Sequence, residues 1–288
     1  MSNRSMEWKL GHGRTLLLDR PRLMAILNVT PDSFSDGGRF VEVDRALAHA
    51  MACVEDGADM IDVGGESTRP GAERVPVDEQ LRRVIPVIER LEAETGALIS
   101  VDTTRAEVAR QALAAGAHAV NDVAAGLEDQ GLLRTVAESN AGVILMHRLR
   151  PPNEDSYSDR YETPPKYGDV VGEVRDFLKQ RASAAVNMGV HERRIVIDPG
   201  LGFGKTVEQN FELVRRGGEL RSLGFPTLGA SSRKSFIGQM SGVEAPRDRV
   251  AGTLAVSVAQ YLAGVRIFRV HDVRAHREAL GVARAILS

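Results

Sequence analysis

The sequence lacks several features that would place it in common protein classes. It has a single cysteine, Cys53, so no disulfide can form within the chain, and the helical pattern around it favours a buried thiol over a reactive one. It contains no apolar run of about 18 residues and no signal-peptide core, which argues against a membrane span and against secretion. The net charge is only −2, so we expect no nucleic-acid partner and no membrane partner. Together these absences predict a soluble, cytoplasmic protein.

Common nucleotide and metal motifs are also missing. Residues 197–206 (IDPGLGFGKT) resemble a phosphate-binding loop, but Pro199 stands where a Walker motif needs its first glycine, and the dinucleotide fingerprint fails as well. The chain has no HxH, HExxH or cysteine cluster, so we expect no tight zinc site. Mg²⁺ prefers oxygen ligands and shares substrate phosphates, so one strand-end oxygen such as that of Asn28 would suffice for it. We find no Ser-His-Asp pattern and no nucleophilic cysteine.

What the chain does have is eight short apolar runs that alternate with helical patterns and end in polar residues. They end at Asn28, Arg69, Asp102, Asp122, His147, Asp198, Lys234 and Asp272. A parallel strand covered on both faces is continuously apolar, so this alternation predicts an α/β fold, a (β/α)₈ TIM barrel with its active site at the C-terminal strand ends. We expect one domain over residues 1–288, with residues 1–21 forming an N-terminal β-hairpin that plugs the lower end and 22–288 forming the barrel.

Glycines and long loops punctuate this pattern. The predicted helices stop at glycines, as C′ positions with positive φ require: Gly57, Gly96, Gly116, Gly142, Gly189, Gly224 and Gly264. Three loops, 28–42, 64–77 and 147–167, are longer than ordinary connections, and long loops in a compact domain are often functional. All three should leave the catalytic face.

The strand ends divide by charge. Asp102, Asn121, Asp122 and Asp198 would project into one mouth and suit a flat heterocycle with N–H donors, because a carboxylate accepts two parallel N–H bonds. The alternative is local: Asp102 and Asp122 could cap helices, and Asp198 could form an Asx turn. We expect the local role for Asp122, and also for Asp272.

Basic residues follow the last two strands, where barrels commonly bind phosphate. They are Arg233, Lys234, Arg269 and His271. His271 alone could be a structural histidine, but Arg269 precedes it by two residues and so shares its strand face. This pairing predicts a phosphate clamp.

Eight motifs, in order, resemble those of the dihydropteroate synthase family of folate biosynthesis from about residue 22 to the C-terminus. They are MAILNVTPDSFSDGG (24–38), DVGGESTRPGA (62–72), ISVDTTR (99–105), ND (121–122), MH (146–147), DPGLGFGK (198–205), SSRKSFIG (231–238) and RVHDV (269–273). The resemblance implies a TIM-barrel transferase, usually a homodimer, that uses Mg²⁺. It would join p-aminobenzoate to 6-hydroxymethyl-7,8-dihydropterin pyrophosphate, giving 7,8-dihydropteroate and pyrophosphate. Sulfonamides, which mimic p-aminobenzoate, would be inhibitors.

The same resemblance implies roles for individual residues. The pterin would contact Asp102, Asn121, Met146, Asp198 and Lys234; the pyrophosphate Asn28, Arg269 and His271; and p-aminobenzoate, with the lid loops, Phe34, Asp36, Thr68, Arg69, Pro70, Phe203 and Ser232. Asn28 would also ligate the metal, and Asp102, Lys234, Arg269 and His271 would take part in catalysis. Since an arylamine is a weak nucleophile with no evident base beside it, we expect a dissociative, S_N1-like substitution with Asp102 supporting the cation.

One segment departs from the family, and two other functions remain open. After His147 the family has a Gly-containing stretch, whereas this chain has Arg150 near that position and a longer loop; we expect this change to touch none of the assigned residues. A pterin-binding methyltransferase would share the acidic site but has no pyrophosphate to hold. A catalytically silent homologue would bind pterin or a protein partner without turnover.

Overall fold

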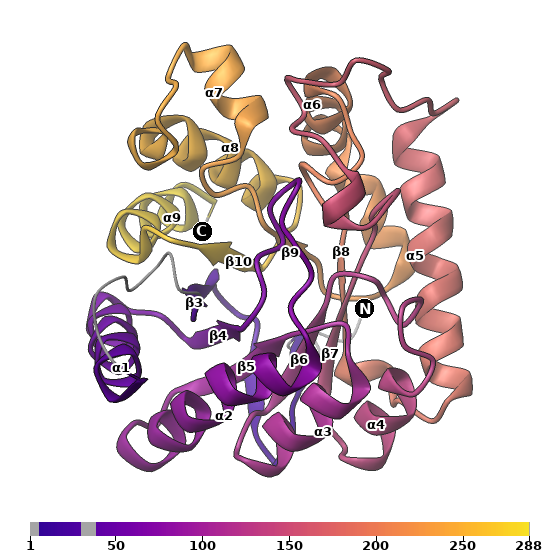
Figure 1. Cartoon of the computed structure of the whole chain (residues 1–288). Helices are drawn as coiled ribbons and strands as arrows, with labels where there is room; N and C mark the ends of the chain where they lie inside the picture. The colour runs from indigo at the N-terminus through magenta and orange to yellow at the C-terminus, as the bar shows by residue number, and fades with distance from the viewer. Residues whose placement is uncertain (1–5, 30–38, 288) are drawn as a thin grey trace.

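The protein alternates strands and helices along its length (Figure 1). The computed structural model describes residues 6–29 and 39–287. The strands are β1 (Glu7–Lys9), β2 (Thr15–Leu17), β3 (Arg22–Asn28), β4 (Met60–Gly64), β5 (Leu98–Asp102), β6 (Ala119–Asp122), β7 (Gly142–Met146), β8 (Ile195–Asp198), β9 (Leu228–Gly229) and β10 (Ile267–Val270). The α-helices are α1 (Arg39–Asp56), α2 (Val77–Glu94), α3 (Ala106–Ala114), α4 (Leu132–Glu138), α5 (Val170–Asn187), α6 (Val207–Arg215), α7 (Ser235–Ser241), α8 (Val250–Leu262) and α9 (Val273–Leu287). Short 3₁₀ turns are η2 (Pro152–Glu154), η3 (Glu192–Arg194), η4 (Gly217–Leu223) and η5 (Pro246–Asp248).

Eight parallel strands form the barrel. Strands β3 to β8 pair in chain order, β10 lies between β3 and β9, and a parallel bridge between Ile197 and Thr227 links β8 to β9. The helices surround the strands on the outside (Figure 1). Connections between parallel strands must cross over, and here a helix does so after almost every strand. The predicted (β/α)₈ barrel is confirmed.

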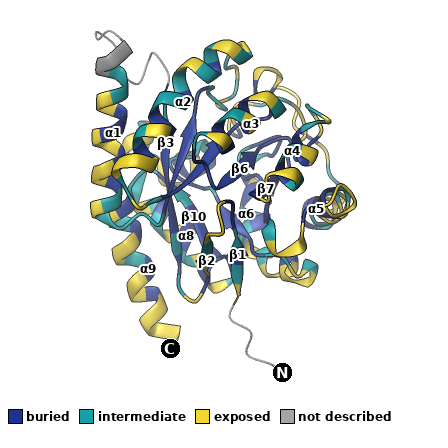
Figure 2. Ribbon diagram, turned by 90° about the horizontal axis from the view of Figure 1, so that it is seen from below, coloured by how far each residue is buried: buried dark blue, intermediate teal, exposed yellow. Residues whose placement is uncertain are grey.

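Side chains alternate along each strand between two hydrophobic regions. In β4, Ile61 and Val63 pack in the large core between strands and helices, whereas Met60 belongs to a separate cluster inside the barrel. By the period of two, Asp62 and Gly64 also face the interior. Figure 2 shows the result: the barrel strands are mostly buried, and the helices expose their outer faces. The interior therefore changes from apolar at the strand starts to polar at the strand ends.

The N-terminal hairpin closes the lower end of the barrel, as predicted. Strands β1 and β2 pair antiparallel, and Trp8 and Leu10 join the interior cluster with Met24 and Met60. The Trp8 indole Nε1 donates to the Arg194 carbonyl oxygen at 2.8 Å. Burying a tryptophan with its one donor satisfied gives the hairpin a fixed seat.

Five of the seven predicted helix-ending glycines have positive φ, but Gly96 and Gly142 do not. Helix α2 ends at an extended Thr95, and Asn140 takes the left-handed conformation (φ 51°) after α4. Gly142 begins β7 instead, where an added Cβ would lie 2.7 Å from Leu10 and 3.0 Å from the Trp8 ring. The hairpin therefore leaves no room for a side chain at position 142.

Two strands are shorter than their apolar runs. Strand β4 ends at Gly64, so Arg69 lies in the following loop, and β9 contains only Leu228 and Gly229, so Lys234 lies beyond a turn. The predicted helix over 206–223 is divided at Gly217 into α6 and η4. In all three cases glycine or polar residues end the regular backbone earlier than hydrophobicity alone suggests. Within the described ranges, we find no helix with the length and apolar character needed to span a membrane.

Candidate active site

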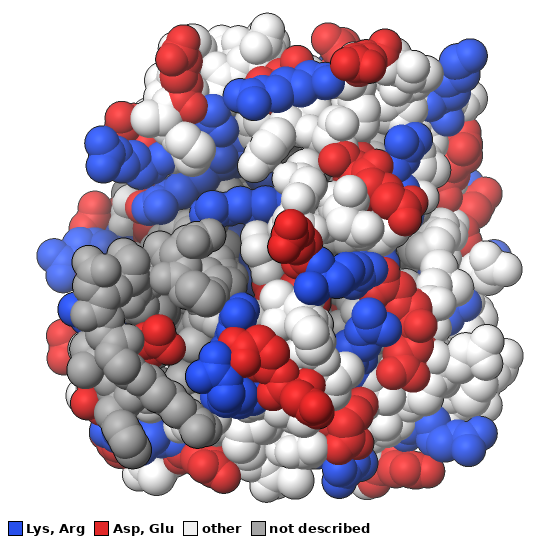
Figure 3. Space-filling view, in the orientation of Figure 1, with Lys and Arg blue, Asp and Glu red and all other residues white. Residues whose placement is uncertain are grey.

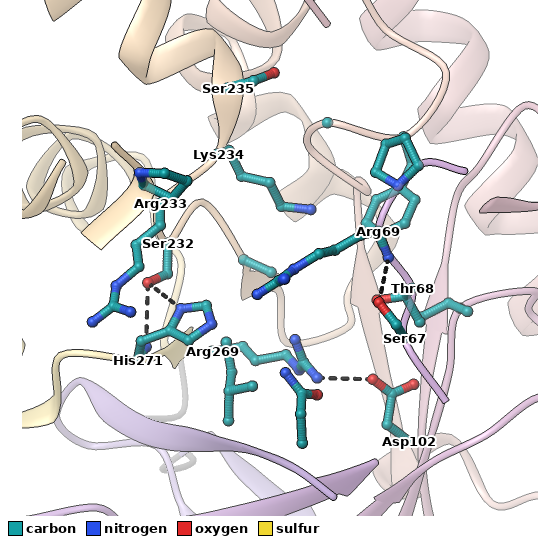
Figure 4. Close-up of a pocket in the computed structure, with 18 of the residues that line it drawn as sticks. Ser67, Thr68, Arg69, Asp102, Ser232, Arg233, Lys234, Ser235, Arg269 and His271 are labelled. Carbon is teal, nitrogen blue, oxygen red and sulfur yellow. Dashed lines mark hydrogen bonds and ion pairs between the residues drawn. The ribbon is translucent and has the colours of Figure 1, made fainter. Parts of the chain in front are cut away.

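A cavity of about 260 Å³ opens at the C-terminal ends of the barrel strands (Figure 4). Most predicted site residues line it: Asn28, Thr68, Arg69, Pro70, Asp102, Asn121, Met146, Asp198, Phe203, Ser232, Lys234, Arg269 and His271. Phe34 and Asp36 lie outside the described residues. One cavity thus brings together residues from strands and strand-end loops that are far apart in sequence.

Asp102 and Asp198 form the acidic side of the cavity. Helix α3 begins after Arg105, and Asp102 binds Arg269 instead of capping it, so the capping alternative for Asp102 is wrong. Asp198 Oδ1 accepts the Gly200 N–H at 2.7 Å, which is the expected loop turn, yet Asp198 also lines the cavity. Burial raises the pKa of Asp198 to about 6, and the Gly200 N–H and Lys234 limit the rise, so the carboxylate is ionised at pH 7.

Asp122 has the local role expected of it. Its two carboxylate oxygens accept the N–H groups of Ala124 and Gly126 and shape the turn after β6. Asp122 does not line the cavity. Asp272, two residues beyond the end of β10, was also expected to act locally, but its carboxylate binds the Arg233 guanidinium through both oxygens, at 2.6 and 3.1 Å. Arg233, one of the predicted phosphate-binding bases, is therefore paired with a carboxylate.

Asp62 is a functional candidate that the sequence pattern did not reveal. It is fully buried in the middle of β4 and accepts hydrogen bonds from Ser100 Oγ at 2.5 Å, Asn121 Nδ2 at 2.9 Å and Arg269 Nε at 2.6 Å. The available signal was its parity: Asp62 lies two residues after the interior Met60 and so had to face the barrel interior. Asp62 fixes two of the predicted site residues, Asn121 and Arg269.

Arg269 lies between two carboxylates. Its Nε binds Asp62, and its Nη2 donates to Asp102 Oδ2 at 2.8 Å (Figure 4). Burial raises the pKa of the Asp102 carboxyl to about 7, with Arg269 opposing the rise and Asp62 adding to it. The guanidinium predicted to hold phosphate is thus positioned in advance by the acidic side of the site.

Lys234 and Phe203 meet on the opposite wall. The Lys234 ammonium lies 4.0 Å from the centre of the Phe203 ring, a cation–π contact, and Figure 4 shows its side chain pointing into the cavity. Burial lowers the pKa of Lys234 to about 8, although Asp198 partly compensates. Lys234 still carries its positive charge at pH 7.

His271 is held in its neutral form. Its ring Nδ1 pairs with Ser232 Oγ at 2.9 Å, and the same hydroxyl oxygen accepts the backbone N–H of His271 at 3.2 Å. Burial, together with Arg233 and Arg269, lowers the pKa of His271 to about 3. A neutral imidazole contributes a hydrogen bond to an anion, whereas the full positive charge comes from Arg269.

The loop after β4 is anchored to its neighbours. Arg74 bridges Glu66 and Glu128, and Glu128 also accepts from Thr104 and Arg148. Burial alone would raise the pKa of Glu128, but these hydrogen bonds lower it to about 2. The network holds the loop so that Arg69, at its tip, points into the cavity (Figure 4).

The unusual loop 147–167 reaches the site, as expected of a loop that leaves the catalytic face, and two of its hydrogen bonds join neighbours of assigned residues. The Gly71 N–H donates to the Pro152 carbonyl at 2.8 Å, next to Pro70, and Asp155 accepts the Gly204 N–H at 2.7 Å, next to Phe203. Tyr157 of this loop lines the cavity. Sequence spacing could not reveal these contacts, because they join loops that follow different strands.

The donor set has limited capacity for metals. Within the described ranges, no three His, Cys, Asp or Glu side chains are grouped so as to hold an ion. Asn28, the last residue of β3, is only partly buried and lines the cavity, and its side chain carries one amide oxygen. On the visible face in Figure 3, acidic and basic side chains are interspersed around the site, without a broad field of one sign.

Comparisons with known proteins agree with this geometry. The family described as "Pterin binding enzyme" matches residues 24–271. Dihydropteroate synthase of Synechocystis is 46% identical over 268 residues, covering 93% of this chain and 90% of that protein, and the Escherichia coli K12 enzyme is 42% identical over 276 residues, covering 96% and 95%. The structure of Xanthomonas albilineans dihydropteroate synthase with 4-aminobenzoic acid superposes with a TM-score of 0.90 at 48% identity, covering 99% of both chains. The chain belongs to the dihydropteroate synthase family, the transferases of folate biosynthesis.

Proposed function

We propose that the cavity holds 6-hydroxymethyl-7,8-dihydropterin pyrophosphate and p-aminobenzoate side by side. The observation that carries this proposal is that one cavity is lined both by carboxylates, Asp102 and Asp198, and by the basic residues Lys234, Arg269 and His271. A structure of the Xanthomonas albilineans relative contains 7,8-dihydropteroate, which joins both substrates in one product. Residues 1–288 then form a single pterin-binding domain.

The pterin lies on the acidic side. Asp198 and Asn121 bind the N–H edge of its ring, Met146 packs against the ring, and Asp102 and Lys234 complete the contacts. An ionised carboxylate accepts two parallel N–H bonds with good geometry, and Asp198 is ionised above about pH 6. Asp62 acts behind this surface, because its bond to Nδ2 fixes the orientation of the Asn121 amide.

The pyrophosphate lies on the basic side, against Arg269 and His271. Arg269 uses Nε and Nη2 for its two carboxylates, and its third nitrogen, Nη1, takes part in neither pair. Asn28 lines the same cavity, and its amide oxygen is the kind of hard ligand that would fit Mg²⁺ brought in with the pyrophosphate. When bound, that ion neutralises charge on the leaving pyrophosphate.

The p-aminobenzoate lies beneath the loop after β4. Thr68, Arg69, Pro70, Phe203 and Ser232 enclose it. The side chains of Arg69 and Lys234 point into the cavity at this end (Figure 4). Their positive charges face the carboxylate or the ring of p-aminobenzoate. Sulfonamides then compete with p-aminobenzoate for the same contacts.

The reaction is a dissociative substitution. The bond between the pterin methylene carbon and the pyrophosphate oxygen breaks, and its electron pair leaves with the pyrophosphate. Arg269 and His271 stabilise that negative charge, and preorganised donors of this kind each contribute about 3–4 kcal/mol. Asp102 supports the cationic methylene. The amine of p-aminobenzoate then bonds to the methylene and releases its proton to water.

Single-turnover rates with ring-substituted anilines test the mechanism. We expect a shallow dependence of rate on amine basicity, because the amine bonds after the leaving group departs. A steep dependence would favour a nucleophile-driven step and refute the dissociative one.

The activity itself is tested by incubating the protein with both substrates and Mg²⁺ and measuring dihydropteroate and pyrophosphate. The expected result is equal amounts of both products, abolished in Asp198→Ala. A folded protein that binds pterin but forms no product would be a catalytically silent homologue.

We also propose that the protein works in the cytoplasm as a homodimer. Helix α8 exposes Ala251, Ala255, Ala259 and Leu262 along one face, and Leu262 is 56% exposed. An apolar helix face of this kind is typical of a subunit interface. Leu262→Glu should convert a dimer to a monomer in light scattering, and an unchanged mass would contradict this interface. The free buried thiol of Cys53 suits a reducing compartment.

A further inference from the structure

The segment 152–158, which we term the brace, connects two walls of the cavity. At one end, the carbonyl oxygen of Pro152 accepts the Gly71 N–H at 2.8 Å, one residue after Pro70. At the other, Asp155 Oδ2 accepts the Gly204 N–H at 2.7 Å, one residue after Phe203. Both contacts therefore lie next to residues assigned to the arylamine end of the site.

Asp155 is the centre of the brace. It is 7% exposed, yet its carboxylate is well satisfied: Oδ1 accepts the Tyr161 hydroxyl at 2.6 Å and the Ser156 N–H at 3.0 Å, and Oδ2 accepts Gly204. Hydrogen bonds to an ionised acceptor are about twice as strong as neutral ones. The geometry of the Gly204 backbone is therefore coupled to the carboxylate of Asp155.

The turn that carries Phe203 depends on such outside support. Gly204 has φ +64°, and a Cβ there would lie 2.3 Å from the Leu149 Cβ, so the turn packs directly against the start of loop 147–167. Beneath it, the buried Lys205 ammonium donates to the carbonyl oxygens of Gly200 at 2.9 Å and Phe203 at 2.8 Å. Asn210 Oδ1 accepts the Gly202 N–H at 2.6 Å, and the Tyr167 hydroxyl donates to the Gly204 carbonyl oxygen at 2.9 Å. Asp155 adds the contact to the Gly204 N–H, the backbone donor next to Phe203.

The brace also contributes to the cavity wall directly. Tyr157 lines the cavity, and it lies between Ser156, which Asp155 holds through its backbone, and Ser158, whose hydroxyl accepts from Asn210 at 3.0 Å. The Tyr157 ring additionally packs with the Arg160 guanidinium, 5.4 Å from its centre. The segment is thus fixed on both sides of the one residue that faces the ligand space.

We propose that Asp155 is a positioning residue for the arylamine substrate, acting through Gly204 on Phe203 and through the brace on Pro70 and Tyr157. This inference rests on the proposed assignment of p-aminobenzoate to that end of the cavity. The unusual loop 147–167 then has a specific role, because it sets the shape of the arylamine pocket, whereas the pterin-binding Asp102, Asn121 and Asp198 lie on β5, β6 and β8.

The test compares three full-length variants, Asp155→Ala, Asp155→Asn and Tyr161→Phe, with the wild type, and treats the two substrates separately. Glu154→Ala is the matched control, because Glu154 is the neighbouring acid of the same segment and is exposed. For each protein we would measure Tm, the Kd for dihydropterin pyrophosphate, and KM and kcat with p-aminobenzoate varied.

In Asp155→Ala we expect KM for p-aminobenzoate to rise about tenfold, equivalent to about 1.4 kcal/mol, with the pterin Kd and kcat changed less than about threefold. Asp155→Asn keeps an oxygen for Gly204, so its KM should rise less, and Tyr161→Phe should show a smaller rise still. Glu154→Ala should match the wild type.

An unchanged KM in a folded Asp155→Ala protein, or equal increases in KM and pterin Kd, would overturn the inference. If Asp155→Ala does not fold, the Asn and Tyr161 variants decide, and wild-type KM values in both would overturn it. A wild type that forms no dihydropteroate would instead refute the proposed function. An active wild type with unaffected variants would refute only the role of Asp155.

Discussion

Replacing Asp62 separates the charge of this buried carboxylate from its hydrogen-bonding geometry. Asp62 Oδ2 accepts both Arg269 Nε and Asn121 Nδ2, and Oδ1 accepts Ser100 Oγ. Asp62→Asn can keep its oxygen toward Arg269 and Asn121 and donate to the Ser100 hydroxyl, so it removes the charge but little geometry. Asp62→Ala removes the acceptor from all three donors.

The expected destabilisation follows from these contacts. Hydrogen bonds to charged groups contribute about 1.5–3 kcal/mol, so we expect Asp62→Asn, in which Arg269 keeps Asp102 as a partner, to lose about 2 kcal/mol. Removing one partner of a buried ion pair costs about 3–5 kcal/mol, so we expect about 4 kcal/mol for Asp62→Ala. At about 2 °C per kcal/mol for a chain of this size, Tm should fall by about 4 °C and about 8 °C, respectively.

Thermal unfolding monitored by circular dichroism measures both losses. Asp44→Asn is the matched control, because Asp44 pairs with Arg90 at 3.1 Å while both side chains are exposed, and such pairs contribute about 0–1 kcal/mol. We also expect Asp62→Ala to lower activity by more than the loss of folded protein explains, because Arg269 and Asn121 both lose the carboxylate that positions them. If Asp62→Ala lowered Tm no more than Asp44→Asn, the buried cluster would not hold Arg269 as argued.

Three further predictions concern single ionisable groups. Asp198→Asn should lower kcat/KM about 100-fold, because a charged hydrogen-bonding pair contributes up to about 3 kcal/mol, and wild-type pterin affinity should fall as pH drops through about 6, where Asp198 protonates; a loss under about fivefold would remove Asp198 from the pterin site. His271, with a pKa lowered to about 3, should stay neutral from about pH 5 to 8 in ¹⁵N NMR of the ring, and a titration near pH 6.5 would contradict the Ser232 arrangement. Glu128 has a pKa lowered to about 2, so its stabilisation is complete above about pH 4.5 and disappears toward pH 2; the Tm deficit of Glu128→Gln should shrink over that interval, and a constant deficit would exclude the role assigned to its Arg partners.

Strand-end residues were predictable because they follow directly from chain order. Asp102 and Asp198 end β5 and β8 as expected, since an apolar run covered on both faces stops where the barrel opens. The lengths of β4 and β9 were less predictable: the predicted runs extended to Arg69 and Lys234, whereas the strands end at Gly64 and Gly229. Arg69 and Lys234 therefore reach the cavity from loops.

Contacts between different loops were the part that sequence spacing could not supply. Arg233 and Asp272 are 39 residues apart, and Asp155 and Gly204 are 49 apart, so neither pairing leaves a periodic signal. Asp62 is an intermediate case. Its parity within β4 placed it inside the barrel, but its partners come from three other strands.

The sequence by itself determined the barrel, the end of the barrel that holds the site, and most of the acidic and basic residues that gather there. These properties depend on the order of polar and apolar residues along each strand and on the period of two. Only the tertiary structure decided which charges remain available to a ligand. Arg233 is paired with Asp272, His271 is neutral beside Ser232, and Arg269 lies between Asp62 and Asp102, because burial and neighbouring charges act through space and not along the chain.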